Sequence, residues 1–162
     1  MELDLNNYIS EYFKIYDLVK SDIAIRSGIP NIPNAAQLKN LIVLAKKLDE
    51  IKSLYPSVFI TNAFRSEKLN NVIRGSSKTS AHMNGLAADI DIPTGKKYAL
   101  LDVFLWIRKT MKFDQIILEF HDTRIPSSGW IHFGLKENHS EYRNQSLYTK
   151  KFKGKTQCLV YS

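Results

Sequence analysis

The run Ser80-Ala-His-Met-Asn-Gly-Leu-Ala-Ala-Asp89 and the later triplet Trp130-Ile-His132 are the most informative parts of this 162-residue sequence. His82 and Asp89 stand seven positions apart with a glycine between them, so a turn can bring both side chains to one point. His132 lies in an apolar run typical of a strand and can join them. Two imidazole nitrogens and one carboxylate oxygen are ligands that zinc accepts, with a fourth position left for water. These residues therefore predict an open metal site, the form that catalytic zinc takes.

Length and composition indicate one folded domain. Hydrophobic residues make up 44% of the chain and charged residues 24%, which excludes a disordered protein and a membrane protein. We predict a single domain over residues 1–162, with an N-terminal helical segment at 1–20 and a basic C-terminal tail at 149–162. We expect a monomer. No apolar run approaches the roughly 18 residues needed to cross a bilayer, so no membrane insertion is expected.

The first residues lack the basic start and the apolar core of a secretory signal. We therefore expect synthesis in the cytoplasm, and an action outside the cell would depend on release by another component. The single cysteine, Cys158, excludes an intramolecular disulfide and a thiol-rich zinc site. Its position, with no histidine beside it, indicates an incidental thiol.

The net charge of +7 predicts attraction to polyanions such as nucleic acid, anionic lipid or acidic wall polymers. Charge alone does not choose among these partners. Lys150, Lys151, Lys153 and Lys155 gather in the tail around Phe152, where we expect a solvated, partly frayed terminus. A nucleic-acid binder would rest on charge alone, because no recognised reader motif accompanies it, so we expect no nucleic-acid partner.

The pattern of apolar residues predicts helices early in the chain and antiparallel strands late. Apolar residues recur at three- and four-residue steps from Asn34 to Leu54, with Asn34 as the N-cap. Residues 8–19 are interpreted as a short amphipathic helix or docking segment. Further helices are predicted at 67–72 and 98–111, and strands at 58–64, 87–92, 113–120 and 130–135. This order favours an α+β domain with a central antiparallel sheet and flanking helices.

Alternation along the two late strands predicts which side chains share a face. Gln115 and Glu119 fall on one face of the first strand, and Trp130 and His132 fall on one face of the second. If the two strands pair in antiparallel fashion, Glu119 and His132 face the same cleft.

The segment Phe64-Arg-Ser-Glu-Lys-Leu-Asn70, together with the run from Gly75 to Ile90, resembles the zinc-dependent peptidoglycan peptidases of the D-alanyl-D-alanine carboxypeptidase type. The signature of that family is Ser-x-His-x-x-Gly-x-Ala-x-Asp, followed downstream by a Trp-x-His strand. This sequence supplies every fixed position. The matching residues are Ser80, His82, Gly85, Ala87, Asp89, Trp130 and His132. The resemblance covers most of the chain, from residue 20 to residue 148.

The resemblance implies the hedgehog-like α+β fold of those peptidases and Zn²⁺ as the cofactor. The implied zinc ligands are His82, Asp89 and His132. The resemblance also implies that Arg65 contacts the substrate and the developing oxyanion, a role that suits a permanently charged, fork-shaped guanidinium. Ser80 and Gln115 are expected to supply polar contacts that fix the ligands or the substrate.

The general base is the least defined part of the predicted site. Many members of the family place a glutamate three residues before the final histidine, where this chain has Gly129. Glu119 is our candidate base, because its face matches that of the final histidine and the most similar subgroup has a glutamate there. The alternatives are Asp91, His121 and Asp122.

Two functions follow from this reading. The first is a zinc metallopeptidase that hydrolyses a peptide bond in peptidoglycan stem peptides, as a carboxypeptidase or as an endopeptidase. Its basic surface suits an anionic cell wall. The missing secretory signal suits a bacteriophage lysis enzyme or virion protein, and it also suits a cytoplasmic bacterial protein. The alternative is a zinc-stabilised module that binds cell wall, or sits in a phage particle, without turnover. The absent Glu-x-x-His glutamate keeps this alternative open.

Overall fold

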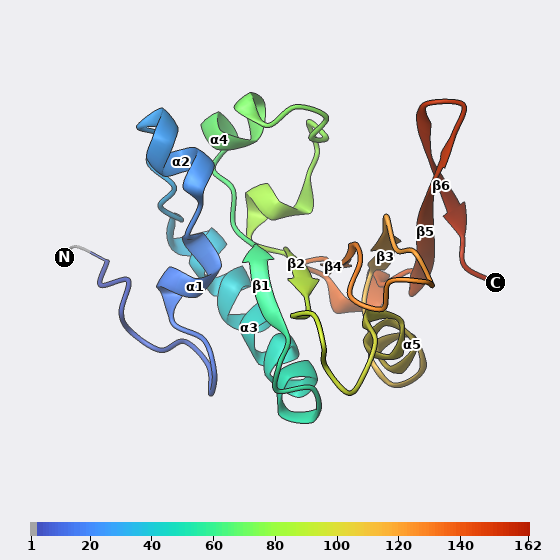
Figure 1. Cartoon of the computed structure of the whole chain (residues 1–162). Helices are drawn as coiled ribbons and strands as arrows, with labels where there is room; N and C mark the ends of the chain where they lie inside the picture. Colours follow the sequence, from blue (N-terminus) through green and yellow to red (C-terminus); the bar gives the residue numbers. More distant parts are fainter. Residues whose placement is uncertain (1–2) are drawn as a thin grey trace.

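The computed structural model describes residues 3–162 (Figure 1). Its helices and short 3-10 turns are α1 (Ile15–Val19), α2 (Asp22–Ser27), α3 (Ala35–Leu54), α4 (Glu67–Val72), η1 (Ala81–Asn84), α5 (Leu100–Thr110) and η2 (His139–Glu141). Its strands are β1 (Phe59–Asn62), β2 (Ala87–Asp91), β3 (Gln115–Glu119), β4 (Trp130–Gly134), β5 (Gln145–Phe152) and β6 (Lys155–Val160).

Within the described chain, the strands form one six-stranded sheet in the order β1-β2-β4-β3-β5-β6. Neighbouring strands are antiparallel except for β3 and β5, which run parallel. The predicted fold class, an α+β domain with a mainly antiparallel sheet and flanking helices, is confirmed. The four strands expected from alternation are all present, each within one to two residues of its predicted bounds at either end.

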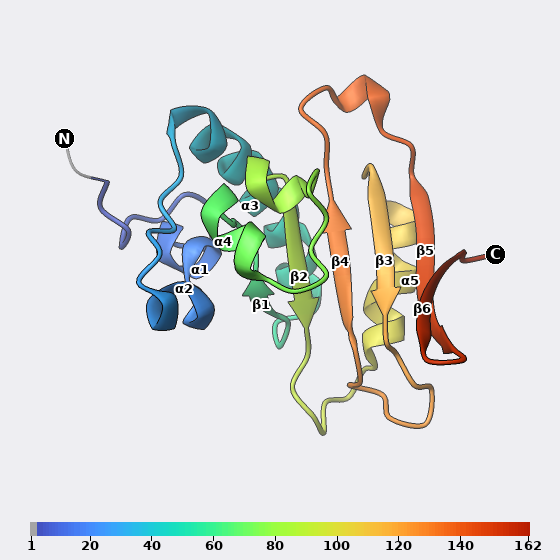
Figure 2. The ribbon, with the colours of Figure 1, turned by 90° about the horizontal axis from the view of Figure 1, so that it is seen from above.

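The two faces of the sheet differ because side chains alternate along each strand. One face is apolar, and its central side chains are Ile90, Ile116, Leu118, Ile131 and Phe133, all of them buried. α3 and α5 lie behind the sheet in Figure 2, and their apolar residues complete this core. The other face carries polar side chains, and the candidate functional site lies on it.

The longest helix, α3, begins as predicted at Asn34. The Asn34 side chain accepts a hydrogen bond from the backbone N–H of Gln37, and the Gln37 side chain accepts one from the backbone N–H of Asn34. This reciprocal pair satisfies N–H groups that the first helical turn leaves free. Within residues 3–162, no helix combines the length and the apolar character that crossing a bilayer would require.

The prediction of a helix over residues 8–19 is wrong for most of that range. Only Ile15–Val19 is helical, and Tyr8 forms an isolated β-bridge with Lys14 instead. The intervening loop is held by the Asp49 carboxylate of α3, which accepts one side-chain and two backbone hydrogen bonds from it. These tertiary hydrogen bonds replace the helical ones. The first two residues of the predicted N-terminal segment lie outside the described chain.

The prediction that the basic tail is partly frayed is also wrong, because residues 149–162 contribute to β5 and β6. The tail is solvated as predicted, since residues 150–160 are exposed. Leu147 is buried at the base of this hairpin, and the Tyr161 ring packs against Phe104 of α5 with centroids 5.0 Å apart. These apolar contacts anchor both ends of the hairpin to the core, although its lysine-rich middle shows no alternation. The hairpin rises from the sheet at the right of Figure 1.

A buried asparagine fixes the loop that follows β1. The Asn31 amide donates hydrogen bonds to the carbonyl oxygens of Val19 (2.7 Å) and Phe64 (3.0 Å). Its side-chain oxygen accepts a hydrogen bond from the backbone N–H of Ser66 at 2.7 Å. Arg65 lies between the two anchored residues, so its backbone is held from both sides.

A glycine connects η1 to β2 where no other residue fits. Gly85 has a φ of 70°, in the left-handed region that side chains disfavour. A Cβ atom at this position would lie 2.7 Å from the carbonyl oxygen of Gln37 in α3. The close approach of η1 to α3 therefore depends on the missing side chain.

We predict that Gly85→Ala lowers the free energy of unfolding by about 2–4 kcal/mol, because the left-handed backbone and the clash both oppose the new side chain. Gly28→Ala is the matched control. Gly28 has a φ of 61° and nothing within 4 Å of an added Cβ, so only the backbone cost of about 1–2 kcal/mol applies. Urea unfolding of the metal-free proteins measures both values. Equal losses in the two variants would contradict the packing argument.

Candidate metal centre

One row of cross-strand neighbours builds the floor of the site. Asn62 of β1 lies opposite Asp89 of β2, Asp89 lies opposite His132 of β4, and His132 lies opposite Ile117 of β3. Directly opposite residues in an antiparallel pair place their side chains on the same face. A bulge between Ile60 and Asn62 shifts the register so that Asn62, rather than Thr61, takes this place.

The second histidine reaches the same point from η1. His82 is buried, and its Nδ1 lies 2.6 Å from the carbonyl oxygen of Ala63. A carbonyl oxygen only accepts, so Nδ1 carries the proton and the lone pair of Nε2 faces the sheet. The backbone N–H of Arg65 in turn donates to the carbonyl oxygen of His82. The ring is thus fixed in both orientation and tautomer, as metal-binding histidines require.

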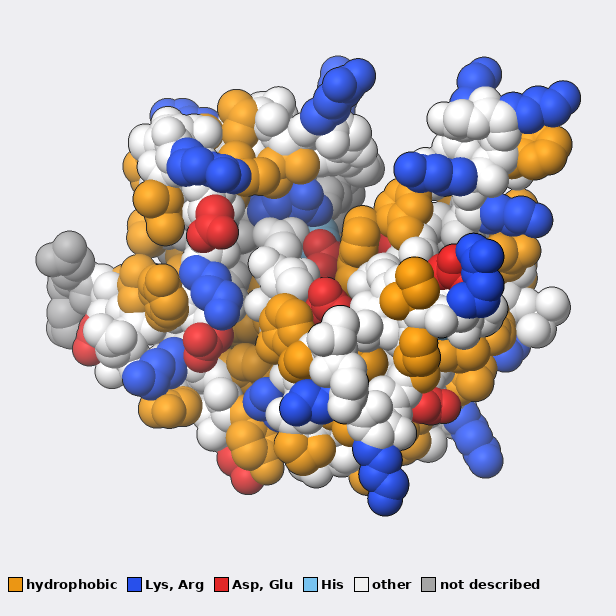
Figure 3. All heavy atoms as spheres, in the orientation of Figure 1, with side chains coloured by type: hydrophobic (Ala, Val, Ile, Leu, Met, Phe, Trp, Pro, Cys, Tyr) orange, Lys and Arg blue, Asp and Glu red, His pale blue; other side chains and the backbone are white. Residues whose placement is uncertain are grey.

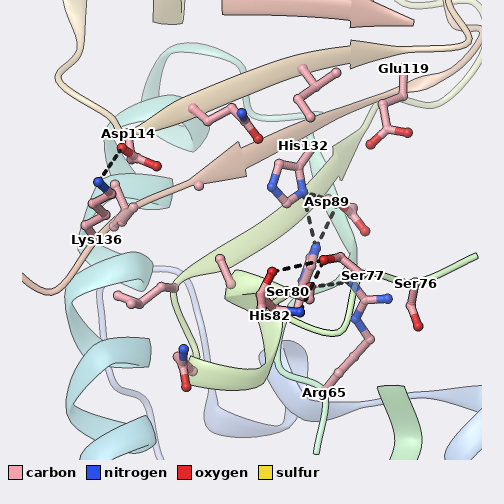
Figure 4. Close-up of a pocket in the computed structure, with 18 of the residues that line it drawn as sticks. Arg65, Ser76, Ser77, Ser80, His82, Asp89, Asp114, Glu119, His132 and Lys136 are labelled. Carbon is pink, nitrogen blue, oxygen red and sulfur yellow. Dashed lines mark hydrogen bonds and ion pairs between the residues drawn. The ribbon is translucent and has the colours of Figure 1, made fainter. Parts of the chain in front are cut away.

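Three predicted ligand atoms meet in a nearly equilateral triangle (Figure 4). His82 Nε2 lies 3.2 Å from His132 Nδ1 and 3.3 Å from Asp89 Oδ1, and His132 Nδ1 lies 3.1 Å from Asp89 Oδ1. Tetrahedral zinc with bonds of about 2.0–2.1 Å places its ligand atoms about 3.3–3.4 Å apart. The donor set and its spacing therefore fit a zinc ion, and all three residues line one cleft.

Burial and charge favour the protonation states that bind a metal. Burial lowers the pKa of His82, which keeps the imidazole neutral. Burial alone would raise the pKa of Asp89, but hydrogen bonding to His132 and His82 outweighs it, so this pKa lies well below the usual range. A neutral imidazole and an ionised carboxylate are the forms that ligate zinc.

Asn62 is a site residue that sequence reasoning missed. Its amide donates a hydrogen bond to Asp89 Oδ2 at 3.2 Å and lies 3.5 Å from His82 Nδ1. Asp89 Oδ2 is thereby held away from the triangle, which leaves Oδ1 as the single ligand atom. An asparagine inside a predicted strand was the available signal, since this residue type is rare there. The bulge that directs it to the site could not be read from the sequence.

The triangle lies in a cleft of about 1060 Å³ on the polar face of the sheet. Figure 3 shows the hollow between the lobe of α2 and α4 and the β5–β6 hairpin. Every residue predicted for the site lines this cleft: Arg65, Ser80, His82, Asp89, Gln115, Glu119 and His132. Ser80 Oγ accepts a hydrogen bond from Arg65 Nη2 at 3.2 Å, and Gln115 Nε2 donates one to Gln145 at 2.6 Å.

Arg65 supplies the positive charge beside the three ligands. Its guanidinium points up toward them in Figure 4. Burial lowers the pKa of Arg65, while the charges of Asp89 and Glu119 oppose this effect. An arginine stays charged under such a shift. Its Nε is buried and makes no hydrogen bond to the described residues, whereas Nη2 donates to Ser80 at the cleft.

Among the four candidate bases, only Glu119 lines the cleft. It projects from the end of β3, on the face that it shares with His132 (Figure 4). Burial raises the pKa of Glu119, and the charge of Asp89 adds to this, while His132 opposes it. The other three candidates are engaged elsewhere: Asp91 with the backbone of Ile92, His121 with Ser128, and Asp122 with Arg124.

Gly129 stands at the Glu-x-x-His position, and the backbone there leaves no room for a side chain. Its φ is 77°, and an added Cβ would lie 2.0 Å from the carbonyl oxygen of Glu119. No side chain fits at this position, because the loop before β4 packs directly against the end of β3. In this loop conformation position 129 accepts no side chain, and the adjoining residue on β3 is Glu119 itself.

The end of the cleft away from Arg65 is lined by an ionic cluster. Arg143 donates two side-chain hydrogen bonds to Asp114, at 2.9 and 2.6 Å, and Lys136 lies 3.7 Å from the same carboxylate. Burial alone would raise the pKa of Asp114, but the Arg143 contacts outweigh it and lower this pKa. Sequence reasoning did not identify this cluster, since its members are far apart in the chain.

A family model described as Peptidase M15 matches residues 11–126, more than two thirds of the chain. The matched range contains Arg65, Ser80, His82, Asp89 and Glu119, and β4 with its histidine follows directly after it. No curated protein matches the chain.

We predict that Asn62→Ala weakens zinc binding about 10- to 100-fold, because the carboxylate of Asp89 loses the contact that orients it. Competition with a chromophoric chelator measures the affinity. Thr61→Ala is the control, since the Thr61 hydroxyl donates to the backbone carbonyl of Asp89 and not to its carboxylate. Equal affinities of the two variants, or a matching loss of thermal stability in the metal-free Asn62 variant, would assign Asn62 a merely structural role.

Proposed function

Because the chain belongs to the peptidase M15 family, we propose that it is a zinc metallopeptidase that hydrolyses a peptide bond in peptidoglycan stem peptides. The observation that carries the proposal is the triangle of His82, Asp89 and His132 on the floor of an open cleft, with an arginine and a glutamate beside it. A structural zinc site is closed by four protein ligands, whereas this one has three.

Zn²⁺ bound by these three side chains supplies a Lewis acid that polarises a carbonyl group and lowers the pKa of water. Arg65 would bind the carbonyl oxygen as it gains negative charge, or a carboxylate of the substrate. Ser80 holds one arm of the Arg65 guanidinium and so limits its rotation. The loop anchored by Asn31 keeps the Arg65 backbone in register with His82.

Glu119 is the proposed general base. Its carboxylate lines the cleft at the end of β3. Burial raises the pKa of Glu119 toward the range in which a carboxyl group both accepts and donates a proton efficiently. It would take a proton from the attacking water and deliver it to the leaving amine. Gln115, two positions along the same face from Ile117, would contact the substrate further along the cleft.

Charge supports the choice of a wall peptide as substrate. The chain carries +7, and the cleft is lined by Arg65 and Arg74 at one end. The other end is mixed, because Lys136 and Arg143 lie beside Asp114, Glu137 and Glu141. Stem peptides are short, extended and rich in carboxylates, so the basic end beside the metal ligands suits them. Both carboxypeptidase and endopeptidase action are compatible with this arrangement.

A second function is favoured by one observation. Gly129 stands where many family members carry a glutamate, and this fits a zinc-stabilised module that binds cell wall without turnover. The two functions differ in whether Glu119 replaces the missing residue.

We expect the zinc-loaded protein to release new amino termini from purified peptidoglycan, and removal of the metal with a chelator to abolish the release. Labelling of free amino groups followed by mass spectrometry identifies the bond. Binding to the wall without any new amino terminus, in a preparation shown to contain one zinc per chain, would favour the non-catalytic module instead.

We predict that Glu119→Gln lowers kcat at least about 100-fold while zinc content stays the same, because the amide keeps the shape of the side chain but cannot accept a proton. Glu67→Gln, on the exposed first turn of α4, is the control and should retain full activity. An active Glu119→Gln enzyme with zinc in place would remove this residue from the mechanism.

A further inference from the structure

The β5–β6 hairpin extends beyond the part of the sheet that the core requires. β5 pairs with β3 as far as Tyr148, and the ladder between β5 and β6 continues to the pair Phe152 and Lys155. Within the described chain, β6 pairs with β5 alone. Every residue from Lys150 to Val160 is exposed. A two-stranded ribbon of this kind gains little stability by itself, so packing does not account for its length.

The hairpin is strongly and uniformly basic. Residues 145–160 contain four lysines and no aspartate or glutamate, which gives a charge of +4 out of the +7 of the whole chain. The lysines are Lys150, Lys151, Lys153 and Lys155. None of the ion pairs formed within residues 3–162 includes one of them. Figure 3 shows Lys and Arg side chains gathered on this projection, at the upper right.

Protection of a sheet edge does not explain these lysines. Charged residues that prevent edge-to-edge pairing belong on the outer strand, here β6. Only Lys155 lies on β6, and the rest of that strand, Thr156–Val160, is uncharged. The lysines instead surround the tip. Lys150 and Lys155 are diagonal neighbours on one face, where like charges repel unless an anion lies between them.

The turn at the tip of the hairpin begins with a lysine in a backbone conformation that disfavours long side chains. Lys153 and Gly154 form the two-residue turn, with φ values of 47° and 77°. Asparagine or glycine is preferred at the first of these positions, because a longer side chain is strained in the left-handed region. A positive charge at the end of the hairpin is therefore present despite a conformational cost.

The base of the hairpin is joined to the wall of the cleft. Thr149 Oγ1 accepts a hydrogen bond from the backbone N–H of Phe120, the residue after Glu119. The Lys151 ammonium lies 5.8 Å from the centre of the Phe120 ring. Figure 1 shows the hairpin rising beside β3, on the side of the sheet away from α3 and α5. A molecule held on the hairpin would therefore lie next to the mouth of the cleft.

We propose that the β5–β6 hairpin is a binding arm for a phosphodiester-bearing anionic polymer of the cell wall. The choice of the wall rests on the proposed function of the neighbouring cleft. Lysine ammonium groups bind phosphates as point charges and need no fixed geometry. A wall polymer held there would keep the cleft close to the peptides of the same wall and would raise their local concentration.

The arrangement of the lysines favours a flexible chain over other polyanions. Lys150 and Lys151 point to opposite faces of the ribbon, and a polymer can wrap both faces whereas a flat bilayer meets one. Proteins that bind single-stranded nucleic acid use several aromatic platforms and arginines. The hairpin has no arginine, and Phe152 is the exposed ring at its tip.

Titration of the zinc-loaded protein with purified poly(glycerol phosphate), followed by calorimetry at low salt, tests the arm. The quadruple variant Lys150→Gln, Lys151→Gln, Lys153→Gln, Lys155→Gln is expected to bind at least about 10-fold more weakly than the wild type. The control variant has the same net charge but loses exposed lysines elsewhere: Lys39→Gln, Lys46→Gln, Lys96→Gln, Lys109→Gln. It should stay within about twofold of the wild type.

Three outcomes would overturn the proposal: no binding by the wild type, equal weakening in the two variants, or tighter binding to an oligodeoxynucleotide or to phosphatidylglycerol vesicles at the same phosphate concentration. Thermal unfolding of each variant shows whether it is folded. Hydrolysis of a short soluble stem peptide by the wild type, with no polymer present, tests the proposed peptidase separately. A protein that cleaves the peptide but fails to bind the polymer would refute the arm alone, and the reverse result would refute the peptidase alone.

Discussion

Asp89 on β2 and His132 on β4 are direct antiparallel partners, and the next pair along, Ile90 with Ile131, points to the opposite face. The same register thus places two metal ligands together on the polar face and two isoleucines together in the core. A slip by one residue would bury the carboxylate and the imidazole and expose the apolar pair. Because the burial of Ile90 and Ile131 opposes any slip, the core itself holds the ligands at their mutual distance of 3.1 Å.

The third ligand depends on a different kind of support. His82 belongs to a single 3-10 turn, which by itself has little stability. Its ring is fixed by the carbonyl oxygen of Ala63, its backbone by Arg65, and the end of its turn by Gly85 against α3. Arg65 is therefore both a neighbour of the ligands and part of the scaffold that positions one of them. A shift of Arg65 would therefore move both the guanidinium that would contact the substrate and the histidine that would bind the metal.

The sequence predicted the parts of the site that follow local patterns. The spacing from His82 to Asp89 and the alternation around Glu119 depend on one turn and one strand period, and the structure brings these residues into one cleft. Asn62 was missed, because its position depends on a bulge that the strand pattern does not reveal. The hairpin at the end of the chain was missed for another reason. Its strands have both faces exposed beyond Thr149, so no alternation of apolar and polar residues marks them.

The three ligand residues come from one turn and two strands, and the pair Asp89 and His132 is separated by 43 positions in the chain. An unfolded chain holds no such triangle, so a metal ion that binds it is a ligand of the native state. At a free metal concentration about 100 times the dissociation constant, binding would add about 2.7 kcal/mol to the free energy of unfolding. Metal supply in the surroundings would then control how long the folded chain survives as well as whether its cleft is competent. Persistence and activity would rise and fall together.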